Sequence, residues 1–159
     1  MAITDSIFDL ADLDGDNGFR LDGFFTSGGS GQSVSNAGDV NGDGFDDFII
    51  GEPLARFDGL AQAGAAYVVF GKAGGFPVSL DLGDLDGTDG FRVEGEAAFD
   101  QAGISVSGAG DINGDGFDDI IVGATRSASK LAEAGASYVI FGKAAGFDAA
   151  FDLFSVDGT

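Results

Sequence analysis

The chain has 159 residues and is strongly acidic, with 27 Asp and Glu against 7 Lys and Arg and a formal net charge of −20 at pH 7. Such a charge opposes non-specific attraction to nucleic acid or to an anionic membrane surface. The absence of Cys and His excludes a disulfide framework and, within this chain, catalysis by Ser-His-Asp, Cys-His or zinc-histidine arrangements. A hydrophobic fraction of 44% with 16 Phe predicts a packed core rather than disorder.

Three sequence blocks recur in the same order along the chain and define an internal repeat. The paired blocks are residues 18–23 and 90–95 (GFRLDG, GFRVEG), 31–52 and 103–124, and 63–76 and 134–147. The offset between copies is 72 residues before the connecting segment and 71 after it, and a third copy begins at 151–159. Periods of this length are typical of stacked supersecondary units.

Within one repeat the apolar segments are short and β-like. In chain order we expect an outer strand at 19–21, then strands at 32–35, 48–50 and 67–70, each bounded by Gly and Asp. No segment shows a helical stripe. Four antiparallel strands per repeat, with apolar inner strands and a more polar outer one, predict an all-β fold built from β-propeller blades.

This pattern divides the chain into three parts. Residues 1–23 are an N-terminal outer strand, which is able to complete another blade. Residues 24–95 form the first repeat, and residues 96–159 form the second repeat without its outer strand. A ring of about four to eight blades is needed for closure. We therefore expect either an excerpt of a longer propeller or a homo-oligomer that closes its ring by strand exchange.

Two nearly identical nonapeptides, DVNGDGFDD at 39–47 and DINGDGFDD at 111–119, occupy the same place in each repeat. Oxygen side chains stand at loop positions one, three, five and nine, and position seven offers a backbone carbonyl. A hard cation such as Ca²⁺ takes six to eight oxygen ligands, and glycines let such a loop turn tightly. The predicted ligands are Asp39, Asn41, Asp43, Phe45 and Asp47 in the first loop, and Asp111, Asn113, Asp115, Phe117 and Asp119 in the second.

A second acidic pattern recurs at 12–18 (DLDGDNG) and 84–90 (DLDGTDG). The second copy has Thr88 where the first has Asp16. Asp in such turns bonds its own backbone, so we interpret this pattern as a tight turn leading into the outer strand. A peripheral cation at these turns remains the alternative.

The repeat resembles the FG-GAP repeat of integrin α-subunit β-propellers and of related bacterial extracellular proteins. The nonapeptides fit that family's DxDxDGxxD cation pattern, with Asn at the second ligand position. The family's Phe-Gly corresponds to Ser30-Gly31 and Ala102-Gly103, and its Gly-Ala-Pro to residues 51–53 and 123–125. The resemblance implies calcium-stabilised blades and a role in adhesion or recognition.

We therefore predict a calcium-binding module without catalysis of its own, which works as an extracellular or cell-surface recognition scaffold. The first residues, MAITDSIFDL, contain no secretory signal peptide, and no apolar run is long enough to span a membrane. A protein or glycan ligand is expected but not identified. The alternatives are a purely structural, self-assembling repeat or engineered building block, and a non-catalytic appendage of a secreted enzyme.

Overall fold

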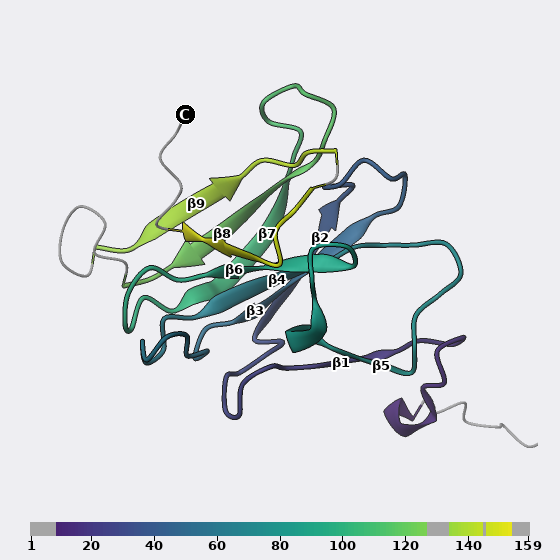
Figure 1. The fold of residues 1–159 in the computed structure, drawn as a ribbon, viewed down its shortest axis with the longest axis horizontal. Coiled ribbons are helices and arrows are strands. Elements are labelled where there is room, and N and C mark those ends of the chain that lie inside the picture. Colours follow the sequence, from purple (N-terminus) through teal and green to yellow (C-terminus); the bar gives the residue numbers. More distant parts are fainter. Residues whose placement is uncertain (1–8, 127–133, 145, 154–159) are drawn as a thin grey trace, which may run out of the picture.

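The computed structural model describes residues 9–126, 134–144 and 146–153, and within them the chain is nearly all β (Figure 1). The first repeat carries β1 (Arg20–Asp22), β2 (Ser33–Gly38), β3 (Asp47–Glu52), β4 (Ala65–Val69), β5 (Ser79–Asp81) and β6 (Gly90–Glu94). The second carries β7 (Ala102–Gly110), β8 (Asp119–Ala124), β9 (Ala136–Ile140) and β10 (Ala150–Asp152). Short 3₁₀ turns lie at Leu10–Asp12 and Leu82–Asp84.

Strands β2, β3, β4 and β6 form an antiparallel sheet that we call the first blade. Its central strands are the predicted apolar runs, and every residue of β4 is buried. Ile49 pairs with Val68, and Val68 pairs in turn with Phe91 of the outer strand. The predicted four-stranded antiparallel unit is therefore confirmed for the first repeat.

Strands β7, β8 and β9 form a second antiparallel sheet, the second blade, in the same order and register as β2, β3 and β4. Among the described residues no strand pairs with the outer edge of β9, whereas β4 has β6 there. Residues 154–159, where the third copy of the repeat continues, lie outside the described residues.

The connecting segments after β4 and β9 contain short strands that the sequence analysis did not predict. Strand β5 pairs in parallel with β1, and β10 pairs in parallel with β6. The two pairings are equivalent, because β1 and β6 are the same block of the repeat and β5 and β10 are the same connection. Strand β10 of the second repeat therefore extends the first blade to five strands.

The core lies on both faces of the first blade. The face toward the second blade contributes Ile49, Val68 and Phe91 to a cluster that includes Ile120 and Val122 of β8. The opposite face packs a different set against the β1–β5 pair and the turns around it. The buried residues of that set are Ile50, Ala65, Tyr67, Val69, Leu82 and Leu85. The partly buried residues packed against them include Leu21, Phe25, Phe76 and Leu80.

A buried carboxylate supports this second cluster. Glu52 at the end of β3 is 0% exposed. Its Oε2 accepts a hydrogen bond from the Tyr67 hydroxyl at 2.7 Å, and its Oε1 accepts one from the Phe25 backbone N–H at 3.2 Å. Burial and the bond to Glu52 raise the pKa of Tyr67, so its hydroxyl remains a donor. The second repeat has Ala124 at the equivalent place, and the Tyr138 hydroxyl donates to Glu96 instead, at 2.6 Å.

We predict that Glu52→Gln lowers the free energy of unfolding by about 1–3 kcal/mol, because one donor then faces an amide N–H₂ instead of an acceptor. Glu96→Gln is the matched control: it alters the equivalent tyrosine contact at a half-buried site and should cost less. Urea unfolding of the two variants measures the difference. Equal losses in both variants would contradict the structural role assigned to Glu52.

Candidate metal-binding loops

The two nonapeptides form the loops that join the first and second strands of each blade, β2 to β3 and β7 to β8. The chain must reverse within a few residues at each loop. Gly42 and Gly44 adopt left-handed φ angles of 74° and 90°, and Gly114 and Gly116 adopt 78° and 94°. Residues with a Cβ rarely take this conformation, so glycine is needed at positions four and six of each loop.

The first carboxylate of each loop organises the turn from inside. Oδ1 of Asp39 accepts hydrogen bonds from the N–H groups of Gly42 and Asp43 at 2.8 and 3.0 Å, and Oδ2 accepts one from Gly44 at 2.9 Å. Asp111 accepts the three equivalent bonds in the second loop, at 2.7, 3.0 and 3.0 Å. The two loops are thus folded in the same way around the same side chain.

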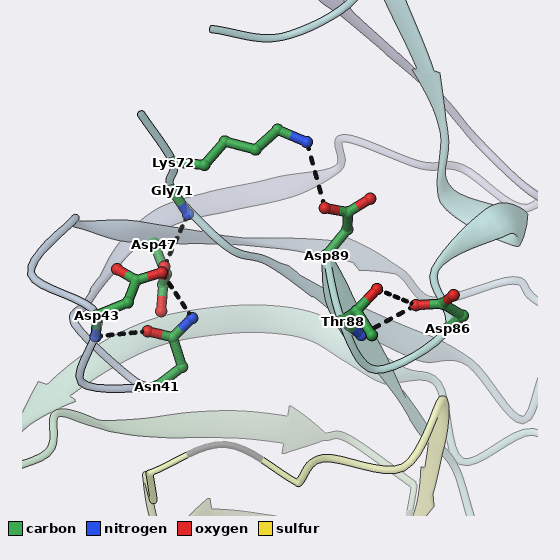
Figure 2. Close-up of polar contacts among 8 residues, drawn as sticks. All are labelled: Asn41, Asp43, Asp47, Gly71, Lys72, Asp86, Thr88 and Asp89. Atoms are coloured by element: carbon green, nitrogen blue, oxygen red, sulfur yellow. Dashed lines mark hydrogen bonds and ion pairs between the residues drawn. The ribbon is translucent and has the colours of Figure 1, made fainter. Parts of the chain in front are cut away.

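The side chains at positions three and five face each other (Figure 2). Asn41 Nδ2 donates to Asp43 Oδ2 at 3.0 Å, and Asn41 Oδ1 accepts from the Asp43 N–H at 2.9 Å. Asp43 Oδ1 also accepts from the N–H of Phe45. The same three bonds recur among Asn113, Asp115 and Phe117.

The carboxylate at position nine joins the loop to a neighbouring turn. Asp47 is 1% exposed, and its Oδ2 accepts a hydrogen bond from the Val40 N–H at 2.9 Å. Its Oδ1 accepts one from the Gly71 N–H at 2.8 Å (Figure 2). Asp119 is 0% exposed and accepts from Ile112 and Gly142. Each of these carboxylates therefore holds its own loop, the start of the second strand and the turn after the third strand together.

Burial raises the pKa of Asp47 from 3.8 to about 6. The hydrogen bonds from Gly71 and Val40 act in the opposite direction, and the nearby charges of Asp43 and Asp39 add to the increase. A cation at this loop would favour the ionised form of these groups. The acidic loop therefore carries an electrostatic cost that a positive charge would reduce.

Within the described residues the structure contains no cluster of three or more acidic side chains already gathered around one point as metal ligands. The donor set nevertheless fits a hard cation, since each loop offers four oxygen-bearing side chains and one backbone carbonyl. Each carboxylate oxygen has two lone pairs, so an oxygen that accepts a single amide, such as Oδ2 of Asp39, keeps capacity for an ion. The residues thus have the right chemistry and the right positions in the loop, and their side chains would have to rotate to bring the oxygens around an ion.

Asp118, at position eight of the second loop, makes a contact that the sequence analysis missed. Its Oδ2 accepts a hydrogen bond from the Asp39 N–H at 2.8 Å, and its N–H donates to the Asp39 carbonyl at 3.1 Å. A Cβ at Gly38 would collide with the Asp118 carboxylate. The two loops therefore contact each other across the junction between the blades. The one sequence signal for this contact is that an aspartate stands at position eight of both nonapeptides.

The weaker acidic pattern forms tight turns, as interpreted from the sequence. Asp14 Oδ1 accepts from the N–H groups of Asp16 and Asn17. In the second copy Asp86 Oδ1 accepts from both the backbone N–H and the hydroxyl of Thr88, at 2.9 and 2.6 Å (Figure 2). These bonds lower the pKa of Asp86.

The fold and the loops together define a repeat protein of stacked antiparallel sheets with an acidic turn at the same end of each sheet. Comparison with known families identifies the repeat: residues 30–69 and 102–140 each match the FG-GAP repeat. The chain therefore contains two FG-GAP repeats, one in each half.

Several proteins with known names are similar to this chain. It is 34% identical over 108 residues to integrin alpha-5 of Xenopus laevis, an alignment of 65% of this chain and 9% of that protein. It is 36% identical over 97 residues to integrin alpha pat-2 of Caenorhabditis elegans, covering 61% of this chain and 7% of that protein. It is also 37% identical over 109 residues to the bovine phosphatidylinositol-glycan-specific phospholipase D, covering 68% and 13%.

The chain thus spans only a small part of the length of these relatives. No helix in the described part of the chain is long and apolar enough to cross a membrane.

The raised pKa of Asp47 predicts a pH dependence in the absence of metal. A group whose folded pKa exceeds its unfolded value contributes stability that is complete below about pH 4 and is lost as the pH rises through about 6. In chelator, the unfolding free energy of the native chain minus that of Asp47→Asn should fall by about 1 kcal/mol between pH 5 and 7. Urea titrations at the two pH values measure this difference.

Asp58→Asn is the control for that comparison, because Asp58 is exposed and lies outside both loops. Its difference from the native chain should not change over the same pH range. A constant difference for Asp47→Asn would show that the Asp47 carboxyl titrates near its ordinary value.

Proposed function

We propose that this chain is a calcium-binding FG-GAP module that serves as an extracellular recognition or adhesion scaffold. The observation that carries the proposal is the duplication of the loop at the residue and hydrogen-bond levels. Both nonapeptides place the same oxygen donors at the same positions between the first and second strands of a blade. Both also repeat the same backbone contacts to Asp39 and Asp111.

The proposed ligands are the side chains at positions one, three, five and nine and the carbonyl at position seven. In the first loop these are Asp39, Asn41, Asp43, Asp47 and Phe45, and in the second Asp111, Asn113, Asp115, Asp119 and Phe117. Oxygen donors of this kind suit Ca²⁺. Neither loop has an acidic residue at position twelve, where Ile50 and Val122 lie, so position nine supplies the last carboxylate.

A bound cation would stabilise the blade by offsetting the repulsion among the three carboxylates proposed as ligands in each loop. The chain's net charge of −20 makes this compensation valuable beyond the loop itself. An ion that binds only the folded state adds RT ln(1 + [Ca²⁺]/Kd), or about 2.7 kcal/mol at a hundredfold excess over Kd. The ion would act as a structural group rather than a catalytic one.

The adhesion part of the proposal is supported by the similarity to integrin alpha chains and by two segments that break the repeat. The segments that differ most between the repeats are 54–62 and 125–133. Segments released from a repeat pattern are where partner contacts are expected. Residues 127–133 lie outside the described residues.

A second candidate is a module that only supports another activity. One of the relatives is named as a phosphatidylinositol-glycan-specific phospholipase D, and its alignment with this chain covers 13% of its length. A non-catalytic appendage of a secreted enzyme is compatible with that similarity. A purely structural building block is the remaining alternative.

We predict that the chain binds two Ca²⁺ ions and that the double variant Asp43→Ala, Asp115→Ala loses both. In calcium its melting temperature should fall to that of the native chain in chelator, because one ligand of each loop is gone. Isothermal titration and thermal unfolding with and without EDTA give the two readouts.

The charge-matched control is Asp58→Asn, Asp148→Asn, which removes two exposed carboxylates outside the loops. It should retain both ions and most of the calcium-dependent stabilisation. Absence of binding heat in the native chain at millimolar calcium, or an unchanged melting temperature on chelation, would overturn the calcium proposal.

The recognition role predicts calcium-dependent retention of the chain on an immobilised surface. Gelatin and a mixed glycan array are suitable probes, read out as bound protein in calcium and in EDTA. Retention that disappears with Asp43→Ala, Asp115→Ala and survives in Asp58→Asn, Asp148→Asn supports the role. No retention on any surface, with calcium bound normally, would favour the purely structural building block.

A further inference from the structure

The face of the first blade that points away from the second blade is only partly covered. The β1–β5 pair packs over one side of it, and beside that pair lies an open hollow of about 530 Å³. Apolar side chains dominate its lining, which includes Leu21, Val34, Phe48 and Ile50. Asp46 of the first nonapeptide lies at its border. A hollow of this kind on a sheet face indicates a docking surface.

The contact between the two blades shows what such a face binds. On the second blade Val106 packs against the core shared with the first blade. A Cβ at Gly42 would collide with the ring of Phe117, so that ring lies close to the first loop. Asp118 accepts the hydrogen bond from the Asp39 N–H. An aliphatic residue, an aromatic ring and a carboxylate thus fasten the second blade to the one before it.

The first blade carries the same three groups, and within the described parts of the chain none of them contacts a neighbouring blade. Val34, the counterpart of Val106, is 67% exposed. Phe45, the counterpart of Phe117, is 42% exposed. Asp46, the counterpart of Asp118, is exposed as well. This face is therefore equipped to receive a blade of the same kind.

The surface of the second blade that faces away from the first blade exposes apolar side chains whose counterparts in the first repeat are buried. Val40 and Phe70 of the first repeat are buried at the junction, with 0% and 5% exposure. Their counterparts Ile112 and Phe141 are 56% and 54% exposed. The free side of the second blade therefore carries the same kind of surface that the first blade uses to bind the second.

The strand edges match in the same way. Strand β4 pairs with β6, whereas among the described residues β9 has no partner on that edge. Strand β1 repeats the sequence of β6 but pairs only with β5. Because Ala65 pairs with Glu94 and Val69 with Gly90, the equivalent register sets Ala136 opposite Asp22 and Ile140 opposite Gly18.

We propose that the hollow and β1 of one chain receive the second blade of another copy of the same chain. In this assembly β1 becomes the fourth strand of the neighbour's β7–β8–β9 sheet, antiparallel to β9. Val34 and Phe45 of one copy pack against the surface that carries Ile112 and Phe141 in the next. By the register of β4 with β6, the new contact begins at Gly18.

The interface joins two different surfaces, so it propagates head to tail and produces a closed ring or an open filament. Propeller rings contain about four to eight blades, which corresponds to two to four copies of this chain. The contacts invoked are strand pairing, apolar packing by Val34 and the ring of Phe45, and the carboxylate of Asp46. None of these side chains is among the proposed side-chain ligands of calcium.

The first experiment measures the mass of the full 159-residue chain in solution by light scattering. We expect a discrete species of two, three or four chains. Val34→Glu should shift it to the single chain, because a charge that is harmless on an exposed side chain would be buried in the assembly. Val78→Glu is the matched control: Val78 is 52% exposed and lies outside the proposed contact, so the assembly should persist.

The second experiment tests the register with engineered cysteines, since the native chain contains none. The bonds from the Phe70 N–H to the Asp89 carbonyl and from the Gly95 N–H to the Gly64 carbonyl mark the hydrogen-bonded pairs between β4 and β6. Ala65 and Glu94 are therefore a non-hydrogen-bonded pair, with Cα atoms close enough for a disulfide. Their counterparts across the new interface are Ala136 and Asp22.

A chain with Ala136→Cys mixed with a chain with Asp22→Cys should give a disulfide-linked heterodimer on oxidation. The control pair, Val139→Cys with Asp22→Cys, is three residues out of register and should remain uncrosslinked. Circular dichroism and a cooperative thermal transition verify that each variant is folded.

Three results would overturn the inference. One is a single-chain mass for the native protein at its highest soluble concentration, as expected if the β9 edge is instead covered by another repeat of the same polypeptide. Another is an assembly that Val34→Glu leaves intact. The third is equal cross-linking of the matched and shifted cysteine pairs, which would indicate random collision rather than strand pairing.

Discussion

The buried carboxylate at the end of each nonapeptide is the interaction on which the rest of the fold depends. Asp47 and Asp119 are almost fully buried, and each accepts one amide from its own loop and one from the turn after the third strand. A buried carboxylate is tolerated only with such partners. Each blade is therefore closed at one end by an acidic side chain, and the acidic loop is part of the sheet's framework.

The same loops also connect the blades. Asp118 binds the backbone of Asp39, and Phe117 lies against Gly42, so the second loop is fastened to the first. Apolar packing between the sheets, with Ile49 and Val68 against Ile120, supplies the rest of the junction. Loop chemistry and blade stacking are thus linked, because the same loop residues take part in both.

Much of this arrangement was predictable from the sequence because it is repeated. The strands of the first blade coincide with short apolar runs between Gly and Asp clusters, and duplication fixed their equivalence. The two loops were located for the same reason. Duplication also made the donor positions evident, although the sequence did not show that their oxygens accept so many backbone amides.

The remaining features had no such signal. Strands β5 and β10 are three residues long, with alternating burial, and their parallel partners lie in another part of the repeat pattern. Glu52 occurs in only one repeat, because Ala124 stands at its counterpart, so repetition could not mark it as structural. Its importance comes from burial beside Tyr67, which is a property of tertiary packing.

The parallel pairing of β10 with β6 means that a sequence repeat and a sheet do not begin and end at the same residues. Residues of the second repeat extend the sheet built by the first, and β5 makes the same connection to β1. A boundary placed between the two sequence repeats would separate strands that belong to one sheet. Each added repeat must therefore be anchored on its predecessor, which favours melting of the array as one cooperative body rather than blade by blade.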